Sequence, residues 1–416
     1  MLIGGFAGLL AGSYPAFYLS AFKPVRVLKG DLQKGRKKST LRNILVVLQF
    51  AISISLLIGT GIIYGQLNYI QNKKLGFDKE HVLVVPLRGD RLQEKYEILK
   101  SELGGLPVVE NITTSMGVPG KSTDGTAYFP EGKSRTDPWL IFNMTVDYDF
   151  IETLGMEMLY GRSFDKKFAT DSSGIIINET LLNKLGWGEE ALNKKFRIGD
   201  PDSGFVFHVI GVVKDFHNNS LHKPIDPFIF YHNPNSFSNL LIRIKPGNIK
   251  QNIEQLEAKW TEIESSFPFD YYFLDKSFDE LYMQEQKMGE TFIYFTVIAI
   301  LIACLGLFGL ASYTAEQRTK EIGIRKTLGS SSTAISMMLT KDFTKWVLVA
   351  NIIAWPLSFY LLDNWLNNFA YSINIFNKWW LFIAAAFISL MIAVFTVLYQ
   401  AMKAANANPV DAIKYE

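Results

Sequence analysis

Long apolar runs dominate the pattern of hydrophobic and polar positions in this chain of 416 residues. Five of them are each long enough to cross a bilayer as a helix, which takes about 20 apolar residues. Pro356 lies inside the fourth run, where a membrane helix tolerates proline if neighbouring helices satisfy the freed carbonyl. The pattern predicts a multi-pass α-helical membrane protein. Its predicted spans cover residues 1–22, 44–65, 289–314, 345–362 and 379–400.

Basic residues gather beside these runs and predict how the chain crosses the membrane. They are dense in the links 23–43 and 315–344 and nearly missing from the short loop 363–378. Because links rich in Lys and Arg stay in the cytoplasm, we place 23–43, 315–344 and the tail 401–416 inside. The long segment 66–288 and the loop 363–378 then lie outside.

The segment 66–288 alternates short β-type runs with helical runs. This alternation predicts an extracytoplasmic α/β (α+β) domain of two subdomains, inserted between the second and third spans. The predicted strands cover residues 81–85, 174–177, 205–213 and 240–244, and the predicted helices cover 91–103, 179–185 and 249–265.

Both ends of this domain predict stalk helices. Residues 278–290 contain no proline and only Gly289 as a weak breaker, so a helix could continue from Phe278 into the third span. Residues 67–72 could extend the second span in the same way. Two stalks of this kind would carry motion between the membrane and the outside domain.

Residues 316–329 follow the third span and combine charge with helical periodicity. Glu321 and Arg325 stand four residues apart, where a helix pairs opposite charges. Ile322, Ile324 and Leu328 supply apolar contacts. The segment is predicted to form a short amphipathic helix that docks a partner. A charged face that merely extends its side chains to the lipid surface is the alternative.

Small and polar residues within the spans predict close helix packing. Gly59 with Gly61, and Gly306 with Gly309, let helices approach one another. Asn43 and Gln49 are expected to be helix-packing residues and not part of an ion path. Ionisable groups are nearly missing from the span interiors, which argues against a proton-coupled pump.

Composition argues against several kinds of chemistry. The net charge of +2 gives no reason to expect a nucleic-acid partner. The single cysteine, Cys304, lies in an apolar run, so disulfides cannot hold the outside domain together and cysteine cannot build a metal site. Gly120-Lys121-Ser122 imitates the end of a phosphate-binding loop, but Ser115 stands where that loop needs its first glycine.

The histidines give no metal site either. His217 and His222 lie close to Asp215, but no further ligand stands at a matched spacing, so a polar loop after the strand 205–213 is the favoured interpretation. No catalytic residue, cofactor or metal is predicted.

A short repeat predicts that the chain is part of a duplicated protein. Residues 24–29 and 409–414 share the pattern Pro-Val-x-x-apolar-Lys, each just past a helix that enters the cytoplasm. We therefore expect the run 1–22 to be the last helix of a preceding repeat, and this chain to be a C-terminal portion or a late start of a longer protein.

The segment 316–329 resembles the coupling segment of FtsX-like ABC transporter permeases of the MacB group, whose permease domain would cover residues 289–409. The outside domain resembles their MacB-like periplasmic core. Motifs in the family's order stand at residues 106–110, 150–156, 161–164, 177–180 and 209–216.

This resemblance implies a bacterial inner-membrane permease driven by a separate cytoplasmic ATPase and paired with a second permease repeat as a dimer or pseudo-dimer. It also implies lipoproteins, peptides or macrolide-type compounds as cargo, with a periplasmic or outer-membrane partner. The fifth span at the front departs from the family's simplest pattern of four. The residues implied to face the ATPase are Glu316, Arg318, Glu321, Ile322, Gly323, Arg325, Leu328 and Gly329.

Two other functions remain open at this point. The chain could regulate a cell-wall hydrolase or a sensor kinase through the same mechanics, without cargo. It could also be a membrane enzyme with a catalytic site in the outside domain, which a convergent acid/base or metal cluster would reveal.

Overall fold

The computed structural model describes residues 35–406, with the exception of 122, 124, 135 and 201–202, and describes no side chains for 35–41 and 320. The predicted span 1–22 and both copies of the Pro-Val-x-x-apolar-Lys pattern lie outside the described residues. The chain forms two compact units. Within the described residues, the membrane unit contains 35–58, 294–358 and 380–406, and the extracytoplasmic unit contains 59–293 and 359–379.

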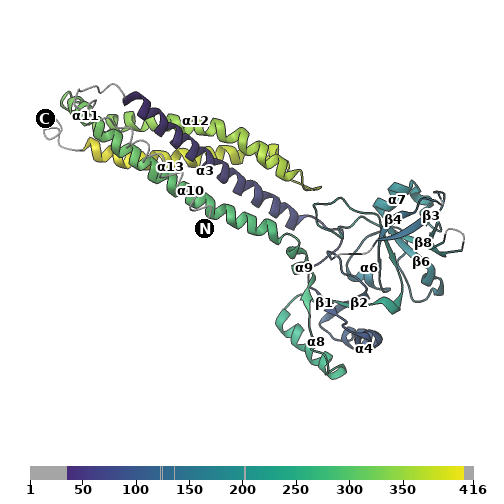
Figure 1. Ribbon diagram of the computed structural model, residues 1–416. Coiled ribbons are helices and arrows are strands. Elements are labelled where there is room, and N and C mark those ends of the chain that lie inside the picture. The colour runs from purple at the N-terminus through teal and green to yellow at the C-terminus, as the bar shows by residue number, and fades with distance from the viewer. Residues whose placement is uncertain (1–34, 122, 124, 135, 201–202, 407–416) are drawn as a thin grey trace, which may run out of the picture. The chain divides into compact units, whose positions relative to one another are not determined.

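Four helices of the described chain are long and apolar enough to cross a membrane (Figure 1). Three of them contain a predicted span and extend beyond both of its ends, whereas the last begins at Trp380, one residue inside the span 379–400, and extends past its end. The segment predicted as the link 315–344 is itself mostly helical, because the third of these helices begins at Ser332. Their bounds are α3 Gly35–Asn72, α10 Met283–Gln317, α12 Ser332–Leu366 and α13 Trp380–Ala405.

Small and polar residues bring these helices together. A Cβ atom at Gly306 would lie 2.8 Å from the Gln49 side-chain oxygen, and one at Gly59 would lie 3.0 Å from the Phe292 ring. Both glycines therefore pack as predicted. Gly309 does not, because a Cβ atom there would have no neighbour within 4 Å among the described residues.

The stalk prediction holds on one side of the domain and fails in part on the other. Helix α3 continues without a break to Asn72. The prediction of one continuous helix from Phe278 into the third span was wrong, because α9 (Leu274–Glu280) ends before Leu281 and α10 begins at Met283. Phe278 is buried in the domain core, so α9 follows the domain and α10 alone continues into the membrane helix.

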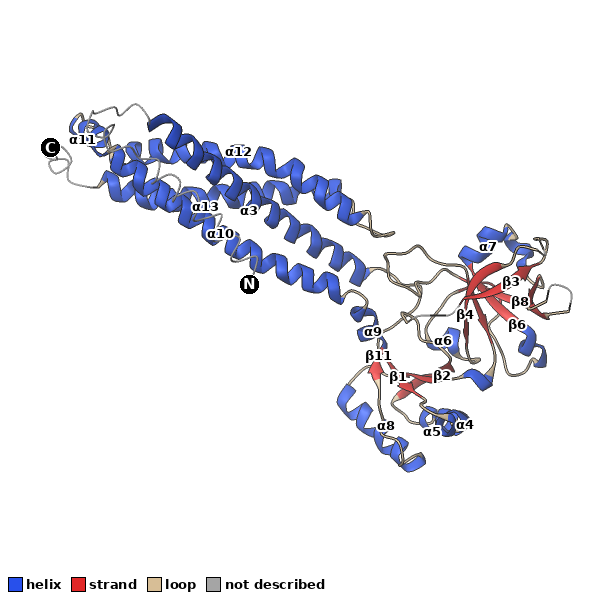
Figure 2. Ribbon diagram, in the orientation of Figure 1, coloured by secondary structure: helices blue, strands red, loops and turns tan. Residues whose placement is uncertain are grey.

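The first subdomain is a four-stranded antiparallel sheet in the order β11-β1-β10-β2 (Figure 2). Successive residues of β1 enter different cores. Val82 and Val84 pack with α6 and α9, while Leu83 and Val85 pack with α5 and α8. Covered faces explain why this strand is apolar throughout. The elements are β1 Val82–Pro86, α4 Asp90–Glu94, α5 Tyr96–Gly104, β2 Val109–Ser115, α6 Phe150–Thr153, β10 Asn239–Ile244, α8 Ile249–Ile263 and β11 Tyr272–Phe273.

The second subdomain is a seven-stranded mixed sheet in the order β5-β8-β6-β9-β4-β3-β7, and an additional β7–β8 pairing closes it. The pairs β4–β9 and β6–β8 are parallel. This confirms the predicted inserted α/β domain of two subdomains. The elements are β3 Gly125–Pro130, β4 Trp139–Thr145, β5 Met158–Gly161, β6 Gly174–Asn178, α7 Glu179–Leu185, β7 Lys195–Ile198, β8 Phe205–Val213 and β9 Phe228–Tyr231.

Candidate functional site

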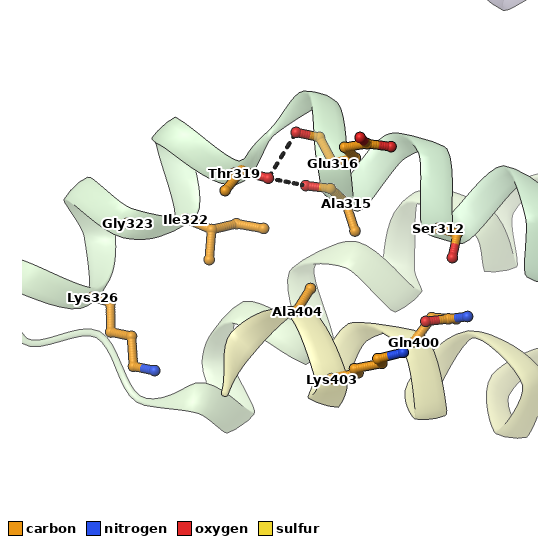
Figure 3. A pocket seen from close by; sticks show the side chains of 10 residues that line it. All are labelled: Ser312, Ala315, Glu316, Thr319, Ile322, Gly323, Lys326, Gln400, Lys403 and Ala404. Carbon is orange, nitrogen blue, oxygen red and sulfur yellow. Dashed lines mark hydrogen bonds between the residues drawn. The ribbon is translucent and has the colours of Figure 1, made fainter. Parts of the chain in front are cut away.

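Residues 316–329 contain the helix α11, Thr319–Thr327, which confirms a helix of its own after the third predicted span. Arg318 separates it from α10, which ends at Gln317. There the Thr319 hydroxyl donates to the backbone oxygens of Ala315, at 3.1 Å, and Glu316, at 2.7 Å (Figure 3).

A glycine ends the helix. Gly329 has φ +88°, and its N–H donates to the Lys326 oxygen while the Ser330 N–H donates to the Arg325 oxygen. This pair of bonds is the usual way in which a left-handed glycine closes a helix. Ser331 then caps α12, since its hydroxyl accepts a bond from the Ala334 N–H. Gly329 therefore sets where α11 stops.

One face of α11 is anchored to the membrane helices. Ile322 is 5% exposed and packs against Ile335 and Leu339 of α12 and Ala401 and Ala405 of α13. Two charged contacts support this packing. Arg318 pairs with Asp342 of α12 at 2.9 Å, and the Lys326 ammonium donates to the Ala405 oxygen at 2.6 Å.

The opposite face is open. Ile324 is 49% exposed and Leu328 is 80% exposed, so the described chain leaves both side chains largely uncovered, and their expected apolar contacts stay a prediction. Of the three predicted apolar residues, Ile322 alone is covered. The predicted Glu321–Arg325 pair is confirmed at 2.8 Å. Helix α11 thus presents two uncovered apolar side chains beside an ion pair.

A cavity of about 310 Å³ lies between the end of α10, α11 and the end of α13 (Figure 3). Glu316 comes from the α10 side, whereas Gln400 and Lys403 come from α13. The cavity lining therefore carries both acidic and basic side chains, which suit a contact with polar groups. The lining residues are Ser312, Ala315, Glu316, Thr319, Ile322, Gly323, Lys326, Gln400, Lys403 and Ala404.

The eight predicted coupling residues separate into three groups. Glu316, Ile322 and Gly323 line the cavity. Arg318, Glu321 and Arg325 form ion pairs, and Leu328 and Gly329 form the helix end. Sequence reasoning missed the Asp342 partner of Arg318, because no local spacing links residues 24 positions apart.

The residues considered for phosphate or metal binding have packing roles. A Cβ atom at Gly120 would lie 2.7 Å from the Phe278 ring, and Lys121 lies over the Tyr272 ring at 3.9 Å. Asp215 accepts bonds from the Thr180 N–H and hydroxyl at 2.7 and 2.8 Å. Among the residues that the structure describes, no group of three or more His, Cys, Asp and Glu side chains could hold a metal ion.

His217 is buried, and its ring meets the Tyr371 ring edge-on at 4.8 Å. Burial, together with the charge of Lys73, lowers the pKa of His217 from 6.5 to about 4. The neutral imidazole is therefore the form that the folded domain holds.

Acidification should weaken this domain through His217. Because its pKa is lowered in the folded state, the unfolded chain binds the proton first, and stability falls as the pH drops from 6.5 to about 4. The loss is on the order of 3 kcal/mol. Hydrogen exchange of the full chain across this range should show a shallower acid dependence in His217→Phe, and an equal dependence would contradict the assignment.

The extracytoplasmic unit holds a larger groove of about 1080 Å³ with a charged lining. Lys100 bridges Asp147 and Asp149 there, with its ammonium 2.5 Å from a carboxylate oxygen of each. Burial alone would lower the pKa of Lys100, but the charge and hydrogen bond of Asp147 outweigh it and the pKa is raised. Lys100 therefore stays charged and ties α5 to the segment after β4.

Two family models match the chain. Residues 44–262 match the MacB-like periplasmic core domain, and residues 293–409 match the FtsX-like permease C-terminal model. The chain is 23% identical over 288 residues to the macrolide export ATP-binding/permease protein MacB of Chromobacterium violaceum. The matched residues cover 65% of this chain and 43% of that protein.

A second curated relative and a solved structure also match the chain. The ABC transporter permease YtrF of Bacillus subtilis is 22% identical over 278 residues, which cover 60% of this chain and 62% of YtrF. The chain thus spans less than two thirds of either relative. The periplasmic region of MacB from Actinobacillus actinomycetemcomitans has a TM-score of 0.35 at 10% identity, covering 50% of this chain and 94% of that one. The core-domain model alone spans more than half of the chain, which therefore belongs to the FtsX-like, MacB-like family of ABC transporter permeases.

Proposed function

We propose that this permease receives the motion of a separate cytoplasmic ATPase at α11 and transmits it to its extracytoplasmic domain. Hydrolysis of ATP is assigned to that partner, and residues 315–344 and 401–416 to the cytoplasm. A second permease repeat would complete the transporter and supply a second coupling helix.

The asymmetry of α11 carries this proposal. Its inner face is anchored through Ile322, Arg318 and Lys326, so a push on the helix reaches α12 and α13 directly. Its outer face leaves Ile324 and Leu328 uncovered. Apolar side chains of this kind, beside charged groups, are typical of protein–protein contacts.

The test is recovery of the ATPase with variants of the outer face. Leu328→Asp and Ile324→Asp each place a charge where an apolar contact would form, and should lower recovery of the cognate ATPase with the full chain about tenfold or more. Glu321→Lys should act in the same direction by reversing the charge beside them. Membrane insertion should be unchanged.

Leu140→Asp is the matched control, because Leu140 is 69% exposed but belongs to the extracytoplasmic domain. It should leave ATPase recovery unchanged. Gly323→Trp is a poorer probe than its position in the sequence suggests, since Gly323 is buried and a large side chain there would disturb the anchoring of α11 itself. Unchanged recovery with both aspartate variants would refute α11 as the docking helix.

For the cargo we propose export or extraction of lipoproteins, peptides or antimicrobial compounds. The support is the family and the relative whose name is macrolide export protein. The groove beside Lys100 is the largest cavity described above and would be the surface of the extracytoplasmic domain to search for contacts with cargo or a partner.

A further inference from the structure

A cluster of contacts joins the loop between α12 and α13 to three other segments of the extracytoplasmic unit. We name it the juxtamembrane latch and define it as Gln66 of α3, His222 of the loop after β8, Glu285 of α10 and the loop residues 368–373. All of them belong to the same compact unit.

Gln66 is the centre of the latch. Its side chain is fully buried, although it is polar and lies on a helix that is predicted to cross the membrane. The amide nitrogen donates to the Tyr371 oxygen at 3.0 Å, and the amide oxygen accepts the Ile373 N–H at 2.9 Å. The side chain therefore bonds to one backbone oxygen and one backbone N–H of the loop, as a neighbouring β-strand would. The two segments lie about 300 residues apart in sequence.

His222 holds the same loop from the domain side. Its backbone oxygen accepts the Ala370 N–H at 3.2 Å, and its ring lies against the Phe369 ring with centroids 4.0 Å apart. The ring nitrogens face Glu285 at 2.9 Å and the Asn368 oxygen at 3.3 Å. Both edges of this imidazole are thus used in joining the loop to α10.

An apolar cluster fills the space between these polar contacts. It contains Ile70 of α3, Leu221, Tyr282 and Phe369. The Leu221 N–H donates to the Tyr282 hydroxyl at 2.7 Å, which fixes the start of α10 against the loop after β8. The latch is therefore a packed joint, and its loop cannot shift without breaking several contacts together.

Helix α12 connects this joint to the coupling helix. It begins at Ser332, packs against Ile322 of α11 through Ile335 and Leu339, and ends at Leu366, immediately before the latch loop. A helix of 35 residues is about 50 Å long and stiff along its axis. One continuous element therefore leads from the proposed docking helix to the latch.

We propose that the latch makes α12 a third transmission rod, beside the two stalks, and that Gln66 and His222 are the positioning residues that connect it to the extracytoplasmic domain. This inference rests on the proposed function, because it assumes that motion enters at α11.

The experiment uses the full chain in complex with its cognate ATPase in lipid nanodiscs, with hydrogen exchange followed before and after ATP. In the wild type, ATP should change exchange in the extracytoplasmic domain. Gln66→Leu removes both amide bonds at nearly constant volume. It should speed exchange of residues 368–373 about tenfold, keep ATPase recovery at the wild-type level, and abolish the ATP response of the domain.

Gln71→Leu is the matched control, because Gln71 lies on the same helix but is exposed. It should leave the ATP response intact. His222→Ala breaks the latch from the other side and should give the same loss of response. It provides the test if Gln66→Leu raises exchange throughout β6 and β8, which would mean that the domain itself is disturbed.

The outcomes separate the two proposals. If the wild-type complex shows no ATP response, the proposed function is contradicted and the latch inference falls with it. If the wild type responds and the variants with a freed loop respond equally, the latch inference alone is overturned.

Discussion

Replacing Gly76, in the segment between α3 and β1, by alanine is expected to lower the stability of the extracytoplasmic domain by more than about 3 kcal/mol. Gly76 has φ +83°, which costs an alanine about 1–2 kcal/mol. In addition, a Cβ atom would lie 2.3 Å from the Asp215 oxygen and 2.7 Å from the Phe216 Cα, both of them backbone atoms. The loop before His217 would have to move. Hydrogen exchange of β1 and residues 212–217 in the full chain measures this effect.

Gly186→Ala separates the two parts of that cost. Gly186 also has a positive φ, +73°, but no atom of the described chain lies within 4 Å of the position its Cβ would take. It should lose only the conformational part, about 1–2 kcal/mol. Equal losses at the two glycines would show that close approach of the loop to Gly76 contributes nothing.

Asp171→Asn is expected to cost about 3 kcal/mol in the second subdomain. The Asp171 side chain is fully buried and accepts bonds from both terminal nitrogens of Arg162, at 2.6 and 2.7 Å, and from the Asp165 N–H at 2.9 Å. The asparagine keeps the shape but loses the charge and turns a donor toward Arg162. Hydrogen exchange of β6 reports the loss.

The same pair predicts a pH dependence. Burial would raise the pKa of Asp171, but the Arg162 hydrogen bonds and the Asp165 N–H lower it below its usual 3.8. The stabilisation is therefore complete above that value and is lost as the pH falls further, so the gap between wild type and Asp171→Asn should close in acid. Glu131→Gln is the control: its contact with Lys194 is half-exposed at 3.5 Å and should be worth less than about 1 kcal/mol. A comparable loss there would show that charge alone, without burial, produces the effect.

The sequence predicted the elements that carry their own periodicity. The bounds of β8 and α7 agree with the runs 205–213 and 179–185, because an apolar strand and a helix with an Asn178 cap and a left-handed Gly186 are defined locally. The membrane helices were found for the same reason, since length and hydropathy are properties of the segment itself.

Elements that depend on distant partners were missed. Strand β11 has only two residues and exists because it pairs with Leu83 and Val84 of β1. The break between α4 and α5 at Lys95 likewise interrupts a run that periodicity joined into one helix. In these places tertiary contacts override local propensity.

The candidate site shows the same division. Spacing within the helix predicted the Glu321–Arg325 pair, but it could not tell which of the three apolar side chains is covered. That choice is made by Ile335, Leu339 and Ala401, which come from two other helices. The latch had no signal at all in the sequence, because Gln66 and Tyr371 meet only in the folded chain.

The pairing of β11 with β1 bears on how the extracytoplasmic domain can diverge between related permeases. These strands are the first and last of the extracytoplasmic domain, and Leu83 stands opposite Phe273. The two ends of the domain therefore leave from neighbouring positions in one sheet, which is the arrangement that tolerates insertion of a whole domain between two existing helices. A remodelled domain can therefore enter and leave between the same two helices, provided that it keeps the contacts of His222 with the loop residues 368–373.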